Sequence, residues 1–160
     1  MSGWENFFLG QLGASATLAG LVFVAISINL KKIMESSYLP NFALEALIAF
    51  VTTLFSALLM LIPTHSFVVW GIGALVLGLL NWMAMTWLYI DTLRKIELSH
   101  RLPVATRLLL YQLAAIAILA AGLTFLVWGA AGFYWIVAAT FLSFLAAFSD
   151  TWLLVVEINR

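Results

Sequence analysis

A single acidic residue lies well inside an otherwise apolar segment near the C-terminus of this sequence. Asp150 is flanked by Ser149 and Thr151 and precedes Glu157, the last residue of the helix expected there, by roughly 10 Å of helical rise. A charged side chain inside a bilayer is costly, so such residues usually face other helices or mark paths for ions and protons. Asp150 is therefore either a structural, hydrogen-bonded carboxylate or a proton or cation site.

Two further polar residues are expected at a depth similar to that of Asp150. Gln112 lies near the start of the preceding, antiparallel helix, and Asn29 ends the first helix, whose other end is marked by Gln11. Because an amide can donate hydrogen bonds to a carboxylate, Gln112 is the nearest expected partner of Asp150. The sequence thus predicts an intramembrane polar site of Asp150, Gln112 and Asn29 that opens toward the cytoplasm.

Small and weakly polar residues recur along the first apolar segment at a spacing of three and four. They are Gly10, Gly13, Thr17, Gly20, Val24 and Ser27. This spacing places them on one face of a helix, and small side chains let a second helix approach closely where lipid supplies no hydrophobic drive. Three interpretations stay open: packing within the chain, an interface between subunits, or the lining of a narrow path.

Five apolar segments must position these side chains. The expected spans are residues 6–30, 42–62, 68–92, 106–128 and 133–157. Each is long enough to cross a hydrocarbon core of about 30 Å. The break at residues 129–132 carries no charge, yet the stretch from 106 to 157 is far too long for one crossing. The prediction is an all-α, polytopic membrane helix bundle with five transmembrane helices, forming a single domain over residues 1–160.

The basic residues predict the orientation of the chain. With five spans, all seven fall on one side: Lys31, Lys32, Arg94, Lys95, Arg101, Arg107 and Arg160. Short loops rich in lysine and arginine stay in the cytoplasm. We therefore expect the N-terminus outside and the C-terminus in the cytoplasm.

Other aromatic and polar residues have local interpretations. Trp70 lies near the expected outer end of the span 68–92, and Tyr111 lies near the expected inner end of the span 106–128. At both positions aromatic side chains are expected to anchor the protein at the lipid–water interface. Glu45 follows Asn41 at a helix start, where a carboxylate complements the helix dipole and Asn41 would serve as N-cap. Asn81 lies near mid-depth and is expected to bond a neighbouring helix.

Composition and motifs exclude several classes of function. The chain is 65% hydrophobic and only 9% charged, against about 25% charged residues in a soluble domain. Zero net charge does not suggest a nucleic-acid partner. The sequence has no cysteine, and its two histidines, His65 and His100, fall in different loops, so we expect neither a metal site nor a cofactor. No catalytic motif is present, and an enzyme is not expected.

The first helix carries a resemblance to a known group of proteins. The run GASATLAGLVFVAISINL at residues 13–30 resembles the opening of small, uncharacterised bacterial multi-pass integral membrane proteins. The resemblance covers one of the five expected helices. It implies a location in the bacterial inner (plasma) membrane and supplies no activity.

These observations leave two functions from different classes. The leading interpretation is a non-enzymatic membrane protein that self-associates and forms a channel or ion path, motivated by the stripe of small residues and by Asp150. The alternative is an accessory or regulatory subunit of a larger membrane complex, such as a membrane protease or transporter. The expected partners are accordingly the lipid bilayer and either further copies of the chain or that larger complex.

Overall fold

Helices make up all regular structure in residues 2–64, 66–95 and 101–158, the part of the chain that the computed structural model describes. They are α1 (Ser2–Ile28), α2 (Leu30–Glu35), α3 (Leu39–Met60), α4 (Phe67–Lys95), α5 (Arg101–Trp128), the short 3-10 helix η2 (Gly129–Ala131) and α6 (Gly132–Ile158). The all-α prediction is confirmed. The long helices begin and end within a few residues of the expected spans, and only α2 was not foreseen.

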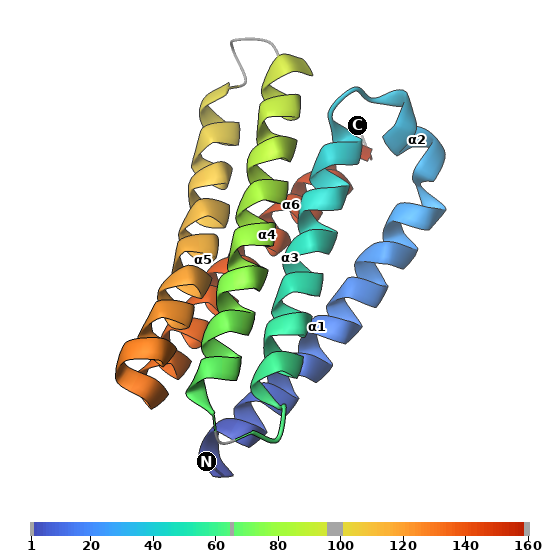
Figure 1. Cartoon of the computed structure of the whole chain (residues 1–160). Helices are drawn as coiled ribbons and strands as arrows, with labels where there is room; N and C mark the ends of the chain where they lie inside the picture. Colours follow the sequence, from blue (N-terminus) through green and yellow to red (C-terminus); the bar gives the residue numbers. More distant parts are fainter. Residues whose placement is uncertain (1, 65, 96–100, 159–160) are drawn as a thin grey trace.

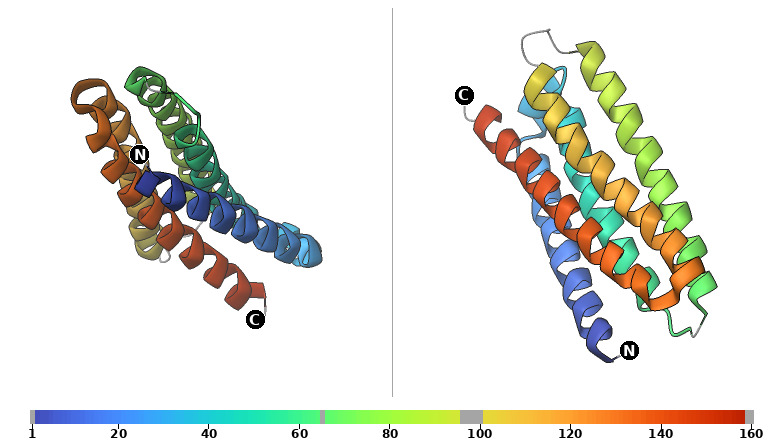
Figure 2. Two further views of the ribbon diagram at one scale, coloured as in Figure 1. Left: turned by 90° about the horizontal axis from the view of Figure 1, so that it is seen from below. Right: turned by 90° about the vertical axis from the view of Figure 1, so that its left-hand side faces the viewer.

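Four continuous stretches of the described residues are long and apolar enough to cross a membrane. They are Gly3–Ile28, Leu39–Met60, Phe67–Lys95 and Leu108–Val156. The last of these is 49 residues long because it runs through η2, where α5 ends and α6 turns back alongside it (Figure 2). Gly129 makes this reversal with a φ of 59°, a left-handed conformation that residues with side chains rarely adopt.

The helices α3, α4, α5 and α6 form a four-helix bundle in which each packs along its neighbour and α6 returns to α3 (Figures 1 and 2). Helix α1 lies outside this ring. It packs mainly against α3 and only lightly against α6. Its most apolar stretch is 17% buried, whereas that of α3 is 56% buried. Helix α1 is thus peripheral, and most of its surface faces the surroundings.

Glycines let α4 and α5 approach each other closely. A Cβ atom added to Gly122 would lie 2.9 Å from the backbone oxygen of Gly71 and 2.6 Å from the Leu75 side chain. A Cβ added to Gly71 would lie 2.8 Å from Leu126. Small residues at a helix crossing are the usual means by which apolar helices maximise van der Waals contact in lipid.

An aromatic cluster fills the bundle at the end where α1 begins. Phe8, Trp70, Phe125 and Phe133 are each at most 3% exposed, and neighbouring rings in the cluster have centroids 5.0–6.0 Å apart. The interpretation of Trp70 as an interface anchor is therefore wrong. Its ring belongs to the core because α4 turns this side chain toward α5 and α6 rather than outward.

The close crossing of α4 and α5 gives a prediction about stability. Gly122→Ala should lower the free energy of unfolding by about 1–3 kcal/mol, the usual cost of overpacking, because the added Cβ would meet the Leu75 side chain and also the Gly71 backbone oxygen, which cannot move aside. Denaturant-induced unfolding in detergent would measure this. Gly3→Ala is the matched control, since an added Cβ there meets no described atom within 4 Å. Equal stability of the two variants would contradict the prediction.

Candidate functional site

Asp150 lies on α6 and points into the bundle rather than toward lipid. Its exposed fraction is 0%, and the Tyr111 hydroxyl of α5 donates a hydrogen bond of 2.5 Å to its Oδ2 atom. Tyr111 is 3% exposed and packs in an apolar cluster that includes Ala46, Phe50 and Ala147. A hydrogen bond to a carboxylate is stronger than one between neutral groups, and an apolar environment strengthens it further.

Gln112 and Asn29 do not join Asp150. Gln112 donates its amide hydrogen bond to the Thr86 hydroxyl of α4, at 2.9 Å, and Asn29 donates to the Ala25 carbonyl of its own helix, at 3.0 Å. The prediction of one polar site formed by these three residues is therefore wrong. Tyr111, the residue before Gln112, does reach Asp150, so the direction in which a side chain points decides which residue makes the contact. Successive side chains on a helix point about 100° apart, so Tyr111 faces α6 while Gln112 faces α4.

Asn29 does line a small cavity, but this cavity does not include Asp150. It has a volume of about 100 Å³ and lies between the end of α1, α2 and α6. Thr151 is on its wall, whereas Asp150 is not among the lining residues and is 0% exposed. The carboxylate is consequently closed off from this opening.

The tyrosine partner of Asp150 escaped the sequence analysis. Tyr111 was interpreted as an interface anchor, and that interpretation is wrong because the ring is buried. The signal that could have found it is a hydroxyl one residue before Gln112, at the depth of a carboxylate that had to be satisfied inside the bundle.

Asn41 and Glu45 also differ from expectation. Helix α3 begins at Leu39 with Pro40 in its first turn, so Asn41 lies inside the helix and is not its N-cap. The Asn41 amide instead donates to Asp91 at 2.8 Å and to Thr92 at 2.9 Å, both on α4. Glu45 follows one turn later and is buried at 8% exposure. Asp91 also pairs with Lys95 on its own helix.

Gln11 and Asn81 hold neighbouring helices together. The Gln11 amide donates to the Thr53 carbonyl and to the Ser56 hydroxyl of α3, each at 2.8 Å. Gln11 is therefore a buried contact and not a solvated helix end, because α1 starts earlier than expected. The prediction for Asn81 is confirmed, since its Oδ1 atom accepts from the Thr52 hydroxyl of α3 at 3.1 Å.

The small residues of α1 face away from the rest of the chain. This set, called the α1 stripe below, comprises Gly10, Gly13, Thr17, Gly20, Val24 and Ser27, and all six are exposed. A Cβ added to any of its three glycines meets no described atom within 4 Å. The Thr17 and Ser27 hydroxyls donate to carbonyls of their own helix.

The buried side chains of α1, such as Phe8, Gln11, Ser15 and Val22, lie on the opposite face from the α1 stripe, as 3.6 residues per turn require. The interpretation that the α1 stripe packs within the chain is therefore wrong. Two interpretations stay open: an interface between subunits and the lining of a path.

Comparison with protein-family models, with curated proteins and with solved structures gives no match for this chain. Its function has to be argued from its own residues. Among the described residues, no group of three histidine, cysteine, aspartate or glutamate side chains could hold a metal ion. His65 and His100 lie outside the described residues.

The bond between Tyr111 and Asp150 predicts a stability effect. Tyr111→Phe removes the donor and leaves the ring in place, so the free energy of unfolding should fall toward the upper end of about 0.6–1.7 kcal/mol, the range for hydrogen bonds between membrane helices. Tyr134→Phe is the control, because this ring is 70% exposed and its loss of a hydroxyl should be neutral. In the Asp150→Asn background the effect of Tyr111→Phe should shrink. A cost equal to that of the control would show that the bond contributes no stability.

Proposed function

We propose that this chain is a membrane protein that crosses the bilayer five times, with the N-terminus outside and the C-terminus in the cytoplasm. The reversal at η2 supports counting α5 and α6 as two crossings. The start of α1 and the end of α6 lie at opposite ends of the bundle (Figure 1), which favours an odd number of crossings. Short loops rich in lysine and arginine favour the cytoplasm.

The basic residues support the same orientation. Lys31 and Lys32 belong to α2, Arg94 and Lys95 end α4, and Arg101 begins α5. These segments gather at one end of the bundle (Figure 1). Residues 1–30 and 33–93 contain no lysine or arginine, so the opposite end has no positive side chain of this kind.

The orientation can be tested with reporter fusions at the two termini. A reporter active only outside the cytoplasm should report at the N-terminus, and one active only inside should report at the C-terminus. An insertion at the α3–α4 connection should report from the outside as an internal control. Two termini on the same side would contradict the five-span proposal.

We further propose that the protein self-associates through the α1 stripe, in a bacterial inner (plasma) membrane. The observation that carries this proposal is a set of three glycines without neighbours on a peripheral helix. Small residues that face lipid make few van der Waals contacts. Against another helix, the same residues let the two backbones approach closely. A second copy of the same stripe fits this face, because an isologous interface places identical surfaces against each other.

The hydroxyls of the α1 stripe support a packing role. Thr17 and Ser27 each donate to a carbonyl four residues earlier, at 2.8 Å, so they leave no unsatisfied donor toward the partner. The face is therefore smooth and nearly apolar. Such a surface favours van der Waals contact between helices over hydrogen-bonded recognition of a polar ligand.

The buried position of Asp150 bears on the proposed ion path. A carboxylate with 0% exposure and a tyrosine hydroxyl on it favours a structural role within one chain. We therefore place any ion path of the assembly along α1, where copies meet, and not through the bundle. The alternative function, an accessory subunit of a larger complex, would use the same α1 stripe against a different membrane protein.

Self-association can be tested by filling the α1 stripe. Gly13→Leu and Gly20→Leu should each disrupt the oligomer in mild detergent, because a bulky side chain prevents close approach. The single chain should stay folded, since a Cβ at either position meets no described atom within 4 Å. Cross-linking and light scattering would measure the oligomer.

Ala138→Leu is the control for this experiment, because it enlarges an exposed position on α6 away from the α1 stripe. Its oligomer should equal that of the parent protein. An unchanged oligomer in both glycine variants would contradict self-association through the α1 stripe. A monomeric parent protein would instead favour the accessory subunit.

A further inference from the structure

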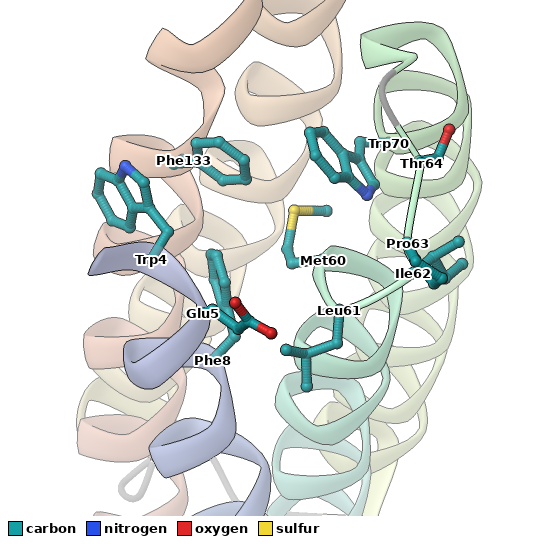
Figure 3. Close-up of a pocket in the computed structure, with 10 residues that line it drawn as sticks. All are labelled: Trp4, Glu5, Phe8, Met60, Leu61, Ile62, Pro63, Thr64, Trp70 and Phe133. Atoms are coloured by element: carbon teal, nitrogen blue, oxygen red, sulfur yellow. The ribbon is translucent and has the colours of Figure 1, made fainter. Parts of the chain in front are cut away.

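A second site lies at the end of the bundle opposite the basic residues. A cavity of about 220 Å³ opens between the starts of α1 and α6, the end of α3 and the start of α4 (Figure 3). Its walls are mainly aromatic and aliphatic, with a few polar groups among them. They include Trp4, Glu5, Phe8, Met60, Leu61, Thr64, Trp70 and Phe133.

One carboxylate lines this cavity. Figure 3 shows the Glu5 carboxylate between Phe8 and Leu61, where it faces the space between α1 and the end of α3. Helix ends of both signs meet here, because α3 ends at this cavity while α1, α4 and α6 begin there, and Glu5 is the one charged side chain among the lining residues. The sequence has no lysine or arginine between residues 1 and 30 or between 33 and 93 that could neutralise Glu5 from this end of the bundle.

The aromatic rings add to the same preference. Trp4 stacks on Phe133 with a centroid distance of 5.2 Å, and Trp70 lies 5.3 Å from the same ring. The face of an aromatic ring is electron-rich and attracts cations, most strongly in tryptophan. A carboxylate and tryptophan rings around one small cavity therefore both favour a positively charged ligand, and an aromatic surround favours an organic ammonium over a metal ion.

The Trp70 indole adds a second requirement. This side chain is 3% exposed, and its Nε1–H group has no hydrogen-bond partner among the described residues. Figure 3 shows the nitrogen turned toward the segment from Met60 to Pro63 that closes the cavity. Because an unpaired buried donor is costly, a ligand that offers an acceptor oxygen would satisfy it.

We propose that this cavity binds an ammonium group with an oxygen acceptor close to it. The ammonium lies against Glu5 and the Trp4 ring, and the oxygen accepts from the Trp70 N–H group. The volume falls below the range of about 300–1,000 Å³ typical of drug-sized ligands, so it suits a small head group. Two sources share this chemistry: a free amino alcohol such as choline, and the head group of phosphatidylethanolamine. The site goes beyond the self-association proposed above and does not depend on it.

Titration calorimetry on the full chain in phosphatidylglycerol nanodiscs tests the cation requirement. Choline and tetramethylammonium should both bind, and Glu5→Gln should weaken each by about tenfold or more, as expected when a charged contact is lost. Glu35→Gln is the matched control, because Glu35 is also exposed and lies on α2, at the other end of the bundle. Glu5 is itself exposed, so its substitution should leave the fold intact.

The acceptor requirement is tested with a second variant and the same two ligands. Trp70→Phe keeps an aromatic ring but removes the N–H group. It should weaken binding of choline more than binding of tetramethylammonium, which has no oxygen. Trp82→Phe, at a 42% exposed position, should change neither affinity. A single unfolding transition at the parent's midpoint would establish that each variant is folded.

Replacing the lipid distinguishes the two sources. If phosphatidylethanolamine nanodiscs abolish choline binding, the site takes a lipid head group; if binding persists, it takes a free amine. Both outcomes support the ammonium site. Absence of saturable binding of either cation in phosphatidylglycerol nanodiscs would overturn it, and so would affinities that Glu5→Gln leaves equal to those of Glu35→Gln.

Discussion

The structure depends on one constraint: a polar side chain inside an apolar bundle must find its partner on another part of the chain, because no water is there to serve. Five buried or half-buried side chains of the described helices meet this constraint in chain order, whereas the Ser15 hydroxyl and the Trp70 N–H group have no partner in that part of the chain. Gln11 joins α1 to α3, Asn41 and Asn81 join α3 to α4, Gln112 joins α4 to α5, and Tyr111 joins α5 to α6. Such bonds contribute only about 0.6–1.7 kcal/mol each in membrane proteins. Their larger effect is on specificity, since a rotated helix would leave a donor or acceptor buried and unpaired.

The same constraint separates the two faces of α1. Its inner face carries the polar tie to α3, while its outer face holds the α1 stripe, whose hydroxyls are satisfied locally. The proposed contact with another chain would therefore not compete with the contact between α1 and α3. Peripheral placement leaves the outer face accessible along the whole helix. A further chain could pack there without any rearrangement of the bundle.

The two ends of the bundle differ in charge and in aromatic content. Basic residues gather at the end formed by α2 and the junction of α4 with α5, whereas the opposite end combines Glu5 with a cluster of buried rings. This difference supports the orientation proposed above, with the basic end in the cytoplasm. It also leaves a carboxylate and an unpaired indole N–H at one small cavity, far from any lysine or arginine. The proposed ammonium site is a consequence of that separation.

The amino-acid sequence by itself determined the helices, their lengths and the breaks between them, because long apolar runs, prolines, glycines and charges act locally. It also determined which residues are too polar to face lipid, such as Asp150. Which partner each of these residues finds was decided only by the tertiary structure. Tyr111 and Gln112 are neighbours in sequence and equal in depth, yet they face different helices. The rotation of each helix about its axis results from packing among all of them, and no local pattern encodes it. For the same reason Trp70 lies in the core, and the α1 stripe faces outward.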